Sequence, residues 1–220
     1  LVRSRGLGDV YKRQRHHRSS VCEWPESMMH DDKDTTHENA KVVEIVNRAL
    51  IRRLSKKGGV VFGQNITAGS RISGLGKGLD KQEGIIALNT PNSENSLMGF
   101  GLGLMLSGTD SAYVMKQHDF ALLGLDHLTN TVNASKICRP TAAFIVLMVV
   151  VDSGFEGPQA SLNNLDEFAS LSRSPVHYLN TRGNVEAAFQ STQSGGLHLM
   201  AVSQKMLRNT FENLPGDTNQ

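Results

Sequence analysis

The sequence predicts an α/β fold, a single three-layer domain in which a mostly parallel sheet of about six strands carries helices on both faces. Short runs that are apolar throughout alternate along the chain with stretches in which apolar residues recur at helical spacing. Such strands are typical of parallel sheets, because the crossover helices bury them on each side. The 220 residues contain no internal repeat and no long linker, which favours one domain.

Apolar periodicity and end signals predict the helices. Residues 39–56 place their apolar side chains on one helical face, and two glycines, Gly58 and Gly59, end this helix. The same spacing predicts four further helices, at residues 96–106, 122–134, 165–172 and 185–193. The strands are predicted where short apolar runs stand between these segments, at residues 60–62, 85–88, 112–115, 144–151, 176–179 and 197–202.

The two ends of the chain are set apart from this domain. Residues 4–14 (SRGLGDVYKRQ) resemble a translated sequencing adapter, so residues 1–14 are treated as an artefact. Residues 15–37 are expected to form a disordered lead-in, with Met28 or Met29 as the true start. The domain is predicted at 38–207, followed by a polar tail at 208–220.

Composition narrows the function classes. Without the four basic residues and one acidic residue of the adapter, the chain has 19 basic and 20 acidic residues, which predicts no nucleic-acid partner. The longest apolar run, at 142–151, is about half the length of a membrane span. Two cysteines in no motif suit a reducing compartment. We therefore expect a cytoplasmic protein without a membrane segment.

Glycine and histidine patterns give weak signals. The run Gly74–Gly78 lacks the upstream glycine of a phosphate-binding P-loop, since Arg71 stands there. Glycines at 99, 101 and 103 lie within a helical pattern, where close packing is their ordinary role. A nucleotide-binding domain is therefore a minor alternative. His118 and His127 lack the convergent ligands of a metal site, and we predict none.

Residues 86–131 carry the strongest functional signal. A strand ends at Asn89, Pro91 turns the chain, and Asn92 or Ser93 caps a glycine-rich helix, so Glu94 is expected at the carboxyl edge of the sheet. The next strand ends near Phe120 at the same edge. A carboxylate and an exposed aromatic ring suit a planar, hydrogen-bonding ligand. The alternative is that Glu94 only complements the helix dipole and that Phe120 belongs to the core.

The chain resembles the pyrimidine-binding domain of thiamine-diphosphate enzymes, specifically the beta subunits of 2-oxoacid dehydrogenases, from about residue 42 to 202. The family pattern is a T-P-x-S-E turn, a G-F helix start, a glycine fourteen residues past the glutamate, a D-F or N-F turn and a D-x-x-x-N helix. These motifs stand here as 90–94 (TPNSE), 99–100 (GF), Gly108, 119–120 (DF), and Asp126 with Asn130. Upstream, residues 63–79 resemble the family's loop and helix.

The resemblance implies a thiamine-diphosphate pyrimidine-domain fold and a cofactor site. Glu94 matches the glutamate that hydrogen-bonds the aminopyrimidine nitrogen and promotes its imino form, so its role is catalytic as well as cofactor-binding. Phe120 matches the aromatic residue that packs on the pyrimidine. Lys116 and His118 flank it and are candidates for cofactor binding and catalysis. Asn163 falls nearest the position of the family's active-site histidine, so His118 or His177 is expected to replace that histidine.

The chain lacks the family's G-D-G and N-N motif for metal and diphosphate. The resemblance therefore implies thiamine diphosphate as cofactor and Mg²⁺ held by a partner chain, a diphosphate-binding subunit of the alpha type in a homo- or hetero-oligomer. The expected substrate is a 2-oxoacid or a ketose-like sugar, cleaved beside its carbonyl with transfer of an acyl or aldehyde unit. The alternative is a non-catalytic α/β assembly module of the same fold.

Overall fold

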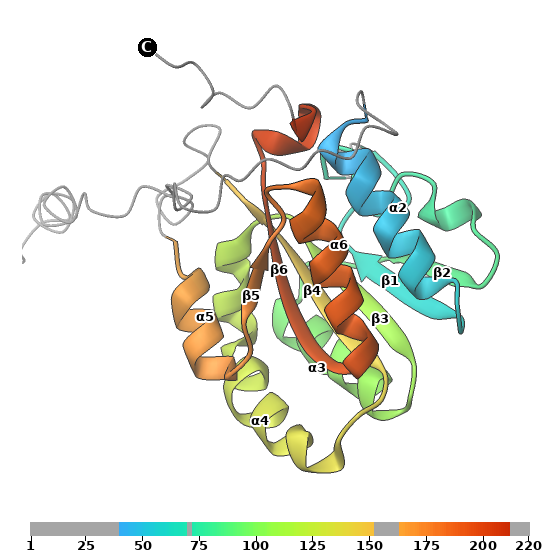
Figure 1. The fold of residues 1–220 in the computed structure, drawn as a ribbon. Coiled ribbons are helices and arrows are strands. Elements are labelled where there is room, and N and C mark those ends of the chain that lie inside the picture. Colours follow the sequence, from blue (N-terminus) through green and yellow to red (C-terminus); the bar gives the residue numbers. More distant parts are fainter. Residues whose placement is uncertain (1–39, 70–71, 152–162, 212–220) are drawn as a thin grey trace, which may run out of the picture.

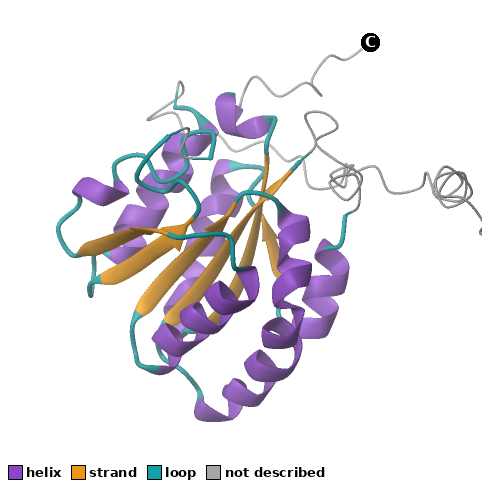
Figure 2. Ribbon diagram, turned by 180° about the vertical axis from the view of Figure 1, so that it is seen from behind, coloured by secondary structure: helices purple, strands orange, loops and turns teal. Residues whose placement is uncertain are grey.

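A computed structural model describes residues 40–69, 72–151 and 163–211 of the chain. The predicted adapter segment and lead-in, at 1–37, and the tail from residue 212 lie outside the described residues. The predicted fold class is confirmed: a six-stranded sheet has the strand order β2-β1-β3-β4-β6-β5, and every neighbouring pair is parallel. Helices lie on both of its faces (Figures 1 and 2).

The strands follow the predicted apolar runs. They are β1 (Gly59–Gly63), β2 (Ile85–Asn89), β3 (Asp110–Met115), β4 (Ala143–Val150), β5 (Val176–Tyr178) and β6 (Gly196–Ser203). Strands β1, β3 and β4 are buried along their whole length, as their sequences require. The two edge strands are less buried: β5 is half-buried throughout, and β2 leaves Ile86 and Leu88 exposed on one face. Strand β2 is therefore present as predicted, but it is covered on one side.

Two helical layers enclose the sheet. One face packs against α2 (Val42–Leu54) and α6 (Arg182–Ser191), whose apolar residues join those of the sheet in one core cluster. The other face packs against α3 (Glu94–Leu106), α4 (Val132–Ser135) and α5 (Leu165–Ser172), which form a second cluster. Helix α3 approaches β4 closely, since a Cβ on Gly101 would lie 2.2 Å from the ring of Phe144. This glycine therefore serves packing, as its position in a helical pattern suggests.

The predicted helix at 122–134 has a different form. A 3₁₀ helix (His118–Gly124), a π-helical turn (His127–Thr131) and α4 follow one another in its place. This segment packs closely on α3, since a Cβ on Gly124 would lie 2.5 Å from Cγ of Met98. Local periodicity contains no information about that contact.

The amino edge of the sheet is held by a buried ion pair. Arg53 of α2 and Asp110, the first residue of β3, pair through the two terminal guanidinium nitrogens and both carboxylate oxygens, with 2.7 Å between Nη2 and Oδ1. Oδ1 of Asp110 also accepts a hydrogen bond from the amide of Ala143 at 2.8 Å, and Nε of Arg53 donates to Oγ1 of Thr192 at 2.8 Å. These contacts tie α2, β3, β4 and the end of α6 together.

The chain after β6 returns to the first helix. A 3₁₀ helix (Met206–Arg208) follows β6, and Thr210 forms an antiparallel bridge with Lys41 just before α2. Phe211 packs against the core cluster on that face. The beginning of the segment predicted as a polar tail thus contacts the domain through residues 210 and 211.

Candidate cofactor site at the carboxyl edge of the sheet

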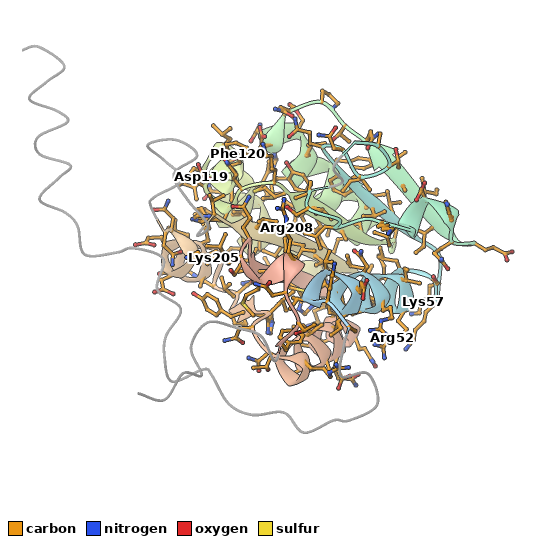
Figure 3. All side chains as sticks on the ribbon, turned by 90° about the horizontal axis from the view of Figure 1, so that it is seen from above. Arg52, Lys57, Asp119, Phe120, Lys205 and Arg208 are labelled. Atoms are coloured by element: carbon orange, nitrogen blue, oxygen red, sulfur yellow. The ribbon has the colours of Figure 1, made fainter. Side chains whose placement is uncertain are left out.

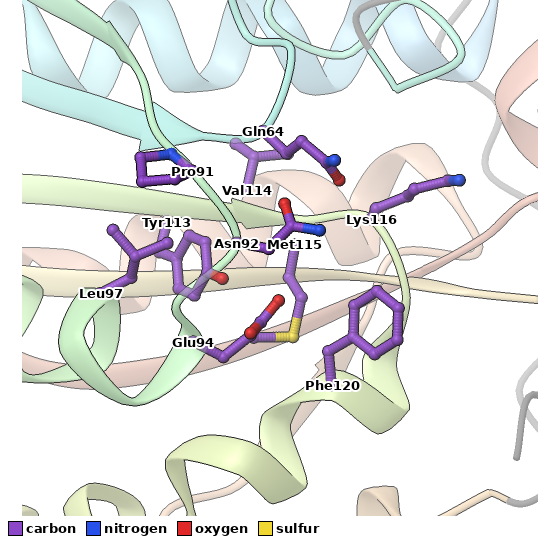
Figure 4. A pocket seen from close by; sticks show the side chains of 10 residues that line it. All are labelled: Gln64, Pro91, Asn92, Glu94, Leu97, Tyr113, Val114, Met115, Lys116 and Phe120. Atoms are coloured by element: carbon purple, nitrogen blue, oxygen red, sulfur yellow. The ribbon is translucent and has the colours of Figure 1, made fainter.

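A small pocket lies where β1, β2 and β3 end at their carboxyl edge (Figure 4). Its lining comes from the loop after β1, the turn before α3, the first turn of α3, the end of β3 and the turn that follows: Gln64, Pro91, Asn92, Glu94, Leu97, Tyr113, Val114, Met115, Lys116 and Phe120. Its cavity volume is about 10 Å³, the space for one water molecule. In this chain, the pocket therefore accommodates only the edge of a ligand.

Local geometry explains why these residues meet. Gly63 ends β1 with φ of 149°, and a Cβ there would lie 2.4 Å from the carbonyl oxygen of Val114, so the close approach of β1 to β3 requires glycine. The amide of Thr90 donates to the carbonyl of Gly63 at 3.1 Å, which fixes the turn after β2 beside β1. The loop after β1 and the turn before α3 are thereby brought to the end of β3.

Glu94 occupies the first position of α3. Ser93 is the N-cap residue, as predicted, but its hydroxyl donates to the hydroxyl of Ser96 at 3.0 Å and caps no backbone amide. The half-buried Glu94 side chain lies in the first turn, where the helix dipole favours a negative charge. Its carboxylate also raises the pKa of the Tyr113 hydroxyl, after the larger effect of burial. Glu94 therefore both complements the dipole of α3 and lines the pocket.

Phe120 lines the pocket from the 3₁₀ helix that follows β3. Its ring is half-buried and packs against the core cluster beneath α3, whereas the sequence predicts an exposed ring. The three polar residues before it, Gln117, His118 and Asp119, are also buried. The reason is that the chain turns directly into a helix that packs back on α3 instead of leaving the core.

The four predicted site residues separate into two groups. Glu94, Lys116 and Phe120 line the same pocket, and Lys116 is exposed. His118 is fully buried and is not part of the pocket lining. The catalytic role suggested for it stays a prediction. Asn163, nearest the family histidine, accepts a hydrogen bond from the amide of Leu165 at 3.2 Å through Oδ1, at the start of α5.

A second, larger hollow adjoins the pocket through Lys116. It has a cavity volume of about 440 Å³, and its described lining consists of Ile72, Ser73, Lys116, Val149, Gln204 and Arg208. Lys116 and Arg208 form no ion pair with another described residue, and none of these lining residues carries a carboxylate. Figure 3 looks down on this edge, with Arg208 and Phe120 labelled on it. The described part of its lining therefore carries positive charge and no negative charge.

Sequence reasoning did not single out Tyr113, Gln64 and Arg208. A tyrosine near the end of an otherwise aliphatic strand was the available signal for Tyr113. Arg208 follows the last strand and was assigned to the polar tail. No local pattern marks Gln64, which reaches the site through the approach of β1 to β3.

The glycine run at 74–78 has a structural role. The amide of Gly76 donates to Oδ1 of Asn47 at 3.0 Å, and the carbonyl of Gly74 accepts from Nδ2 of Asn47 at 2.9 Å. The run is thus hydrogen-bonded to α2. Among the described residues, no group of three histidine, cysteine, aspartate or glutamate side chains is placed to hold a metal ion. No described helix is long and apolar enough to cross a membrane.

Comparison with known proteins shows similarity in structure alone, since no family model and no curated protein matches the chain. A split-gene transketolase, solved as an inactive β4 tetramer, has a TM-score of 0.54 and 15% identity over 76% of this chain and 52% of that one. The 2-oxoglutarate:ferredoxin oxidoreductase of Magnetococcus marinus, with 2-oxoglutarate, coenzyme A and succinyl-CoA bound, has a TM-score of 0.52 and 12% identity, covering 78% and 30%. The thiamine-diphosphate-dependent 4-hydroxybenzoylformate decarboxylase of Rhodococcus jostii has a TM-score of 0.50 and 15% identity, covering 78% and 31%.

These matches establish a fold similar to domains of a transketolase and of thiamine-diphosphate-dependent enzymes. The chain spans about half of the transketolase chain and under a third of the other two.

Proposed function

We propose that this chain is the pyrimidine-binding domain of a thiamine-diphosphate-dependent enzyme, closest in kind to the beta subunit of a 2-oxoacid dehydrogenase. The observation that carries the proposal is the meeting of Glu94 and Phe120 in one pocket at the carboxyl edge of a transketolase-like sheet. The family resemblance assigns these two residues to the aminopyrimidine ring. They lie on different elements, 26 positions apart in the sequence, so only the fold brings them together.

The lining fits the edge of an aminopyrimidine. Glu94 supplies a carboxylate for a ring N–H, Phe120 supplies an aromatic face, and Leu97 adds an apolar wall. The cavity is too small for the whole cofactor, and the described residues offer no metal cluster. We therefore assign the diphosphate and Mg²⁺ to a partner chain, a subunit of the alpha type that closes the site from outside.

When bound, thiamine diphosphate supplies the carbanion chemistry that cleaves a bond beside a carbonyl group. The Glu94 carboxyl group holds the ring nitrogen and exchanges a proton there. The ring of Phe120 covers the pyrimidine and excludes water from it. Since His118 does not line the pocket, we assign the proton transfer at this edge to Glu94.

The adjoining hollow supports an anionic substrate. Lys116 and Arg208 line it, and Lys116 also borders the Glu94 pocket, so an anion held there lies next to the ligand edge. A 2-oxoacid carboxylate or the charged end of a ketose-like sugar matches this pair of cations. We propose a substrate of this class.

The alternative is a non-catalytic assembly module of the same fold. It is favoured by the fact that a split transketolase with a similar fold was solved as an inactive tetramer of one chain type. The two functions differ in one measurable respect, since a catalytic domain must bind the cofactor once its partner is present.

The test begins with the open reading frame beside this gene, which is expected to encode a chain with G-D-G and N-N motifs. The two chains are co-expressed, and thiamine diphosphate with Mg²⁺ is titrated calorimetrically into the complex and into this chain alone. We expect micromolar binding by the complex and weak or no binding by this chain. Tight binding by the isolated chain contradicts the split site, and absence of binding by both supports the module.

Glu94→Gln in the complex tests the catalytic assignment. The amide cannot exchange the proton, so hydrogen–deuterium exchange at the thiazolium carbon of the cofactor is expected to slow by about 10²–10⁴-fold. Glu167→Gln is the matched control, because Glu167 also lies in the first turn of a helix but is exposed on α5. Exchange as fast in Glu94→Gln as in the control shows that Glu94 only complements its helix.

A further inference from the structure

The larger hollow extends across the carboxyl ends of three adjacent strands. Lys116 directly follows β3, Val149 lies on β4, and Gln204 directly follows β6. Strand β4 pairs with both β3 and β6, and the amide of Gln204 donates to the carbonyl of Val150 at 2.9 Å. Because adjacent strands lie about 5 Å apart, the ends of β3 and β6 are separated by about 10 Å. The hollow therefore runs along the sheet edge, away from the Glu94 pocket.

Two positively charged side chains line this hollow at different places relative to the small pocket. Lys116 borders both, whereas Arg208 borders only the larger hollow. Arg208 ends the 3₁₀ helix that follows β6, and its side chain is exposed. Figure 3 shows Arg208 well apart from Phe120 on this edge. A ligand whose reacting end enters the small pocket therefore meets Lys116 first and Arg208 farther out.

The size of the hollow exceeds what a small 2-oxoacid fills. Its volume of about 440 Å³ lies within the range of about 300–1,000 Å³ that is typical of ligand pockets. A carboxylate next to a carbonyl group takes up only the part beside Lys116. The rest of the volume, with Arg208 on its wall, suits a longer ligand that carries a further charged group.

The backbone on the opposite wall is strained. Ile72 and Ser73 both line the hollow, and both have positive φ, 49° and 59°. For a β-branched residue such as isoleucine this conformation is a clear outlier. Residues held in such conformations are typical of ligand sites, where the surrounding structure keeps them in place. The strain therefore favours a binding role for the hollow over an incidental gap.

We propose that the substrate is a 2-oxoacid with a second anionic group at its far end. Lys116 binds the carboxylate next to the carbonyl group, and Arg208 binds the far group. This inference rests on the proposed function for the reaction. The guanidinium of an arginine matches a carboxylate or a phosphonate through two parallel hydrogen bonds, so both kinds of far group share the required chemistry. A 2-oxoacid with a single charge leaves Arg208 without a partner.

The first experiment needs neither the cofactor nor the partner chain, because the lining residues belong to this chain. The free chain is titrated by NMR with 2-oxoadipate, with its far-end methyl ester, and with the analogue that carries a phosphonate in place of the far carboxylate. We expect the diacid to bind at least about 10-fold more tightly than the ester. The Nε signal of Arg208 is expected to shift with the diacid and the phosphonate and to stay unchanged with the ester. The tighter of the two charged probes identifies the far group.

Substitutions separate the two ends of the ligand. Arg208→Gln is expected to lower the affinity for the diacid to that for the ester and to leave the affinity for the ester unchanged. Lys116→Gln is expected to weaken both probes, since both carry the carboxylate beside the carbonyl group. Arg52→Gln is the matched control, because Arg52 is exposed on α2 and lines neither hollow. Equal affinities of the unsubstituted chain for the diacid and the ester, or no binding of either, overturn the proposal.

The two proposals fail in different ways. In the complex with its partner chain, kcat/KM for the diacid is expected to exceed that for the ester by about 10-fold or more, and Arg208→Gln is expected to remove this preference. If the complex binds no cofactor while the free chain discriminates between the probes, the proposed function is wrong and the anion site stands. If the complex binds the cofactor and cleaves singly charged 2-oxoacids or ketoses as well as the diacid, the substrate class is wrong and the pyrimidine-binding role stands.

Discussion

Removal of the Asp110 carboxylate is expected to be among the most destabilising single changes in the domain. Asp110 is 4% exposed, and its Oδ1 accepts hydrogen bonds from Nη2 of Arg53 at 2.7 Å and from the amide of Ala143 at 2.8 Å. Asp110→Ala leaves a nearly buried guanidinium without its counter-charge and an amide without its acceptor. Both groups were desolvated when the chain folded.

The magnitude follows from these two groups. Removal of one partner of a buried ion pair costs about 3–5 kcal/mol, and an unsatisfied buried amide costs about 1–3 kcal/mol. The two costs overlap because one oxygen serves both donors. In Asp110→Ala, Arg53 also retains its two hydrogen bonds to Thr192, from Nε to Oγ1 at 2.8 Å and from Nη2 to the carbonyl oxygen at 3.2 Å. The expected loss of unfolding free energy is therefore about 3–5 kcal/mol.

Urea unfolding followed by circular dichroism measures this loss, with the slope of the transition confirming two-state behaviour. Asp126→Ala is the control, because Asp126 is exposed and, among the described residues, its side chain accepts one hydrogen bond, from Asn130 at 2.7 Å. Its cost is expected to stay within about 0.5 kcal/mol. The double variant Arg53→Met/Asp110→Leu is expected to regain part of the loss, since no charge remains unpaired. A cost below about 1 kcal/mol for Asp110→Ala refutes the reasoning.

The fold class is predictable from the sequence because a strand that is buried on both faces of a sheet has a continuous run of apolar residues. Strand β4 reads as a continuous apolar run, and the structure buries every residue of it. The order of the strands was not predictable, because pairing depends on contacts between distant segments. The same limit applies to the segment at 122–134, which packs on α3 at Gly124 and contains short helical segments of different types in place of one regular helix.

The site was predictable only in part for a similar reason. Glu94 is predictable because it belongs to a turn and helix start that are contiguous in sequence. Such a local motif can be recognised without knowing the fold. Tyr113 looks like an ordinary core residue in sequence, and its place in the pocket lining depends on a helix that starts 19 positions earlier. Phe120 was expected to be exposed because three polar residues precede it. Polar residues can be buried wherever the fold supplies a compact turn, as it does here.

Two further predictions concern histidines and Phe120. Burial lowers the pKa of His177 and of His198, so the unfolded chain binds more protons than the folded chain below about pH 6.5. The free energy of unfolding is therefore expected to fall as the pH drops through that value. Urea midpoints that stay constant between about pH 7.5 and 5.5 contradict this prediction. Phe120→Ala is expected to weaken cofactor binding by the complex about 5-fold or more, because one aromatic face of the pocket is lost. Since the ring is only half-buried, the accompanying loss of stability should be well below the 3–5 kcal/mol or so of a fully buried phenylalanine. Leu123→Ala is the control, because Leu123 lies on the same 3₁₀ helix, is 62% exposed and does not line the pocket. A full-sized loss of stability in Phe120→Ala with unchanged affinity would assign the ring to the core, and the pocket would then lose the face against which a planar ligand packs.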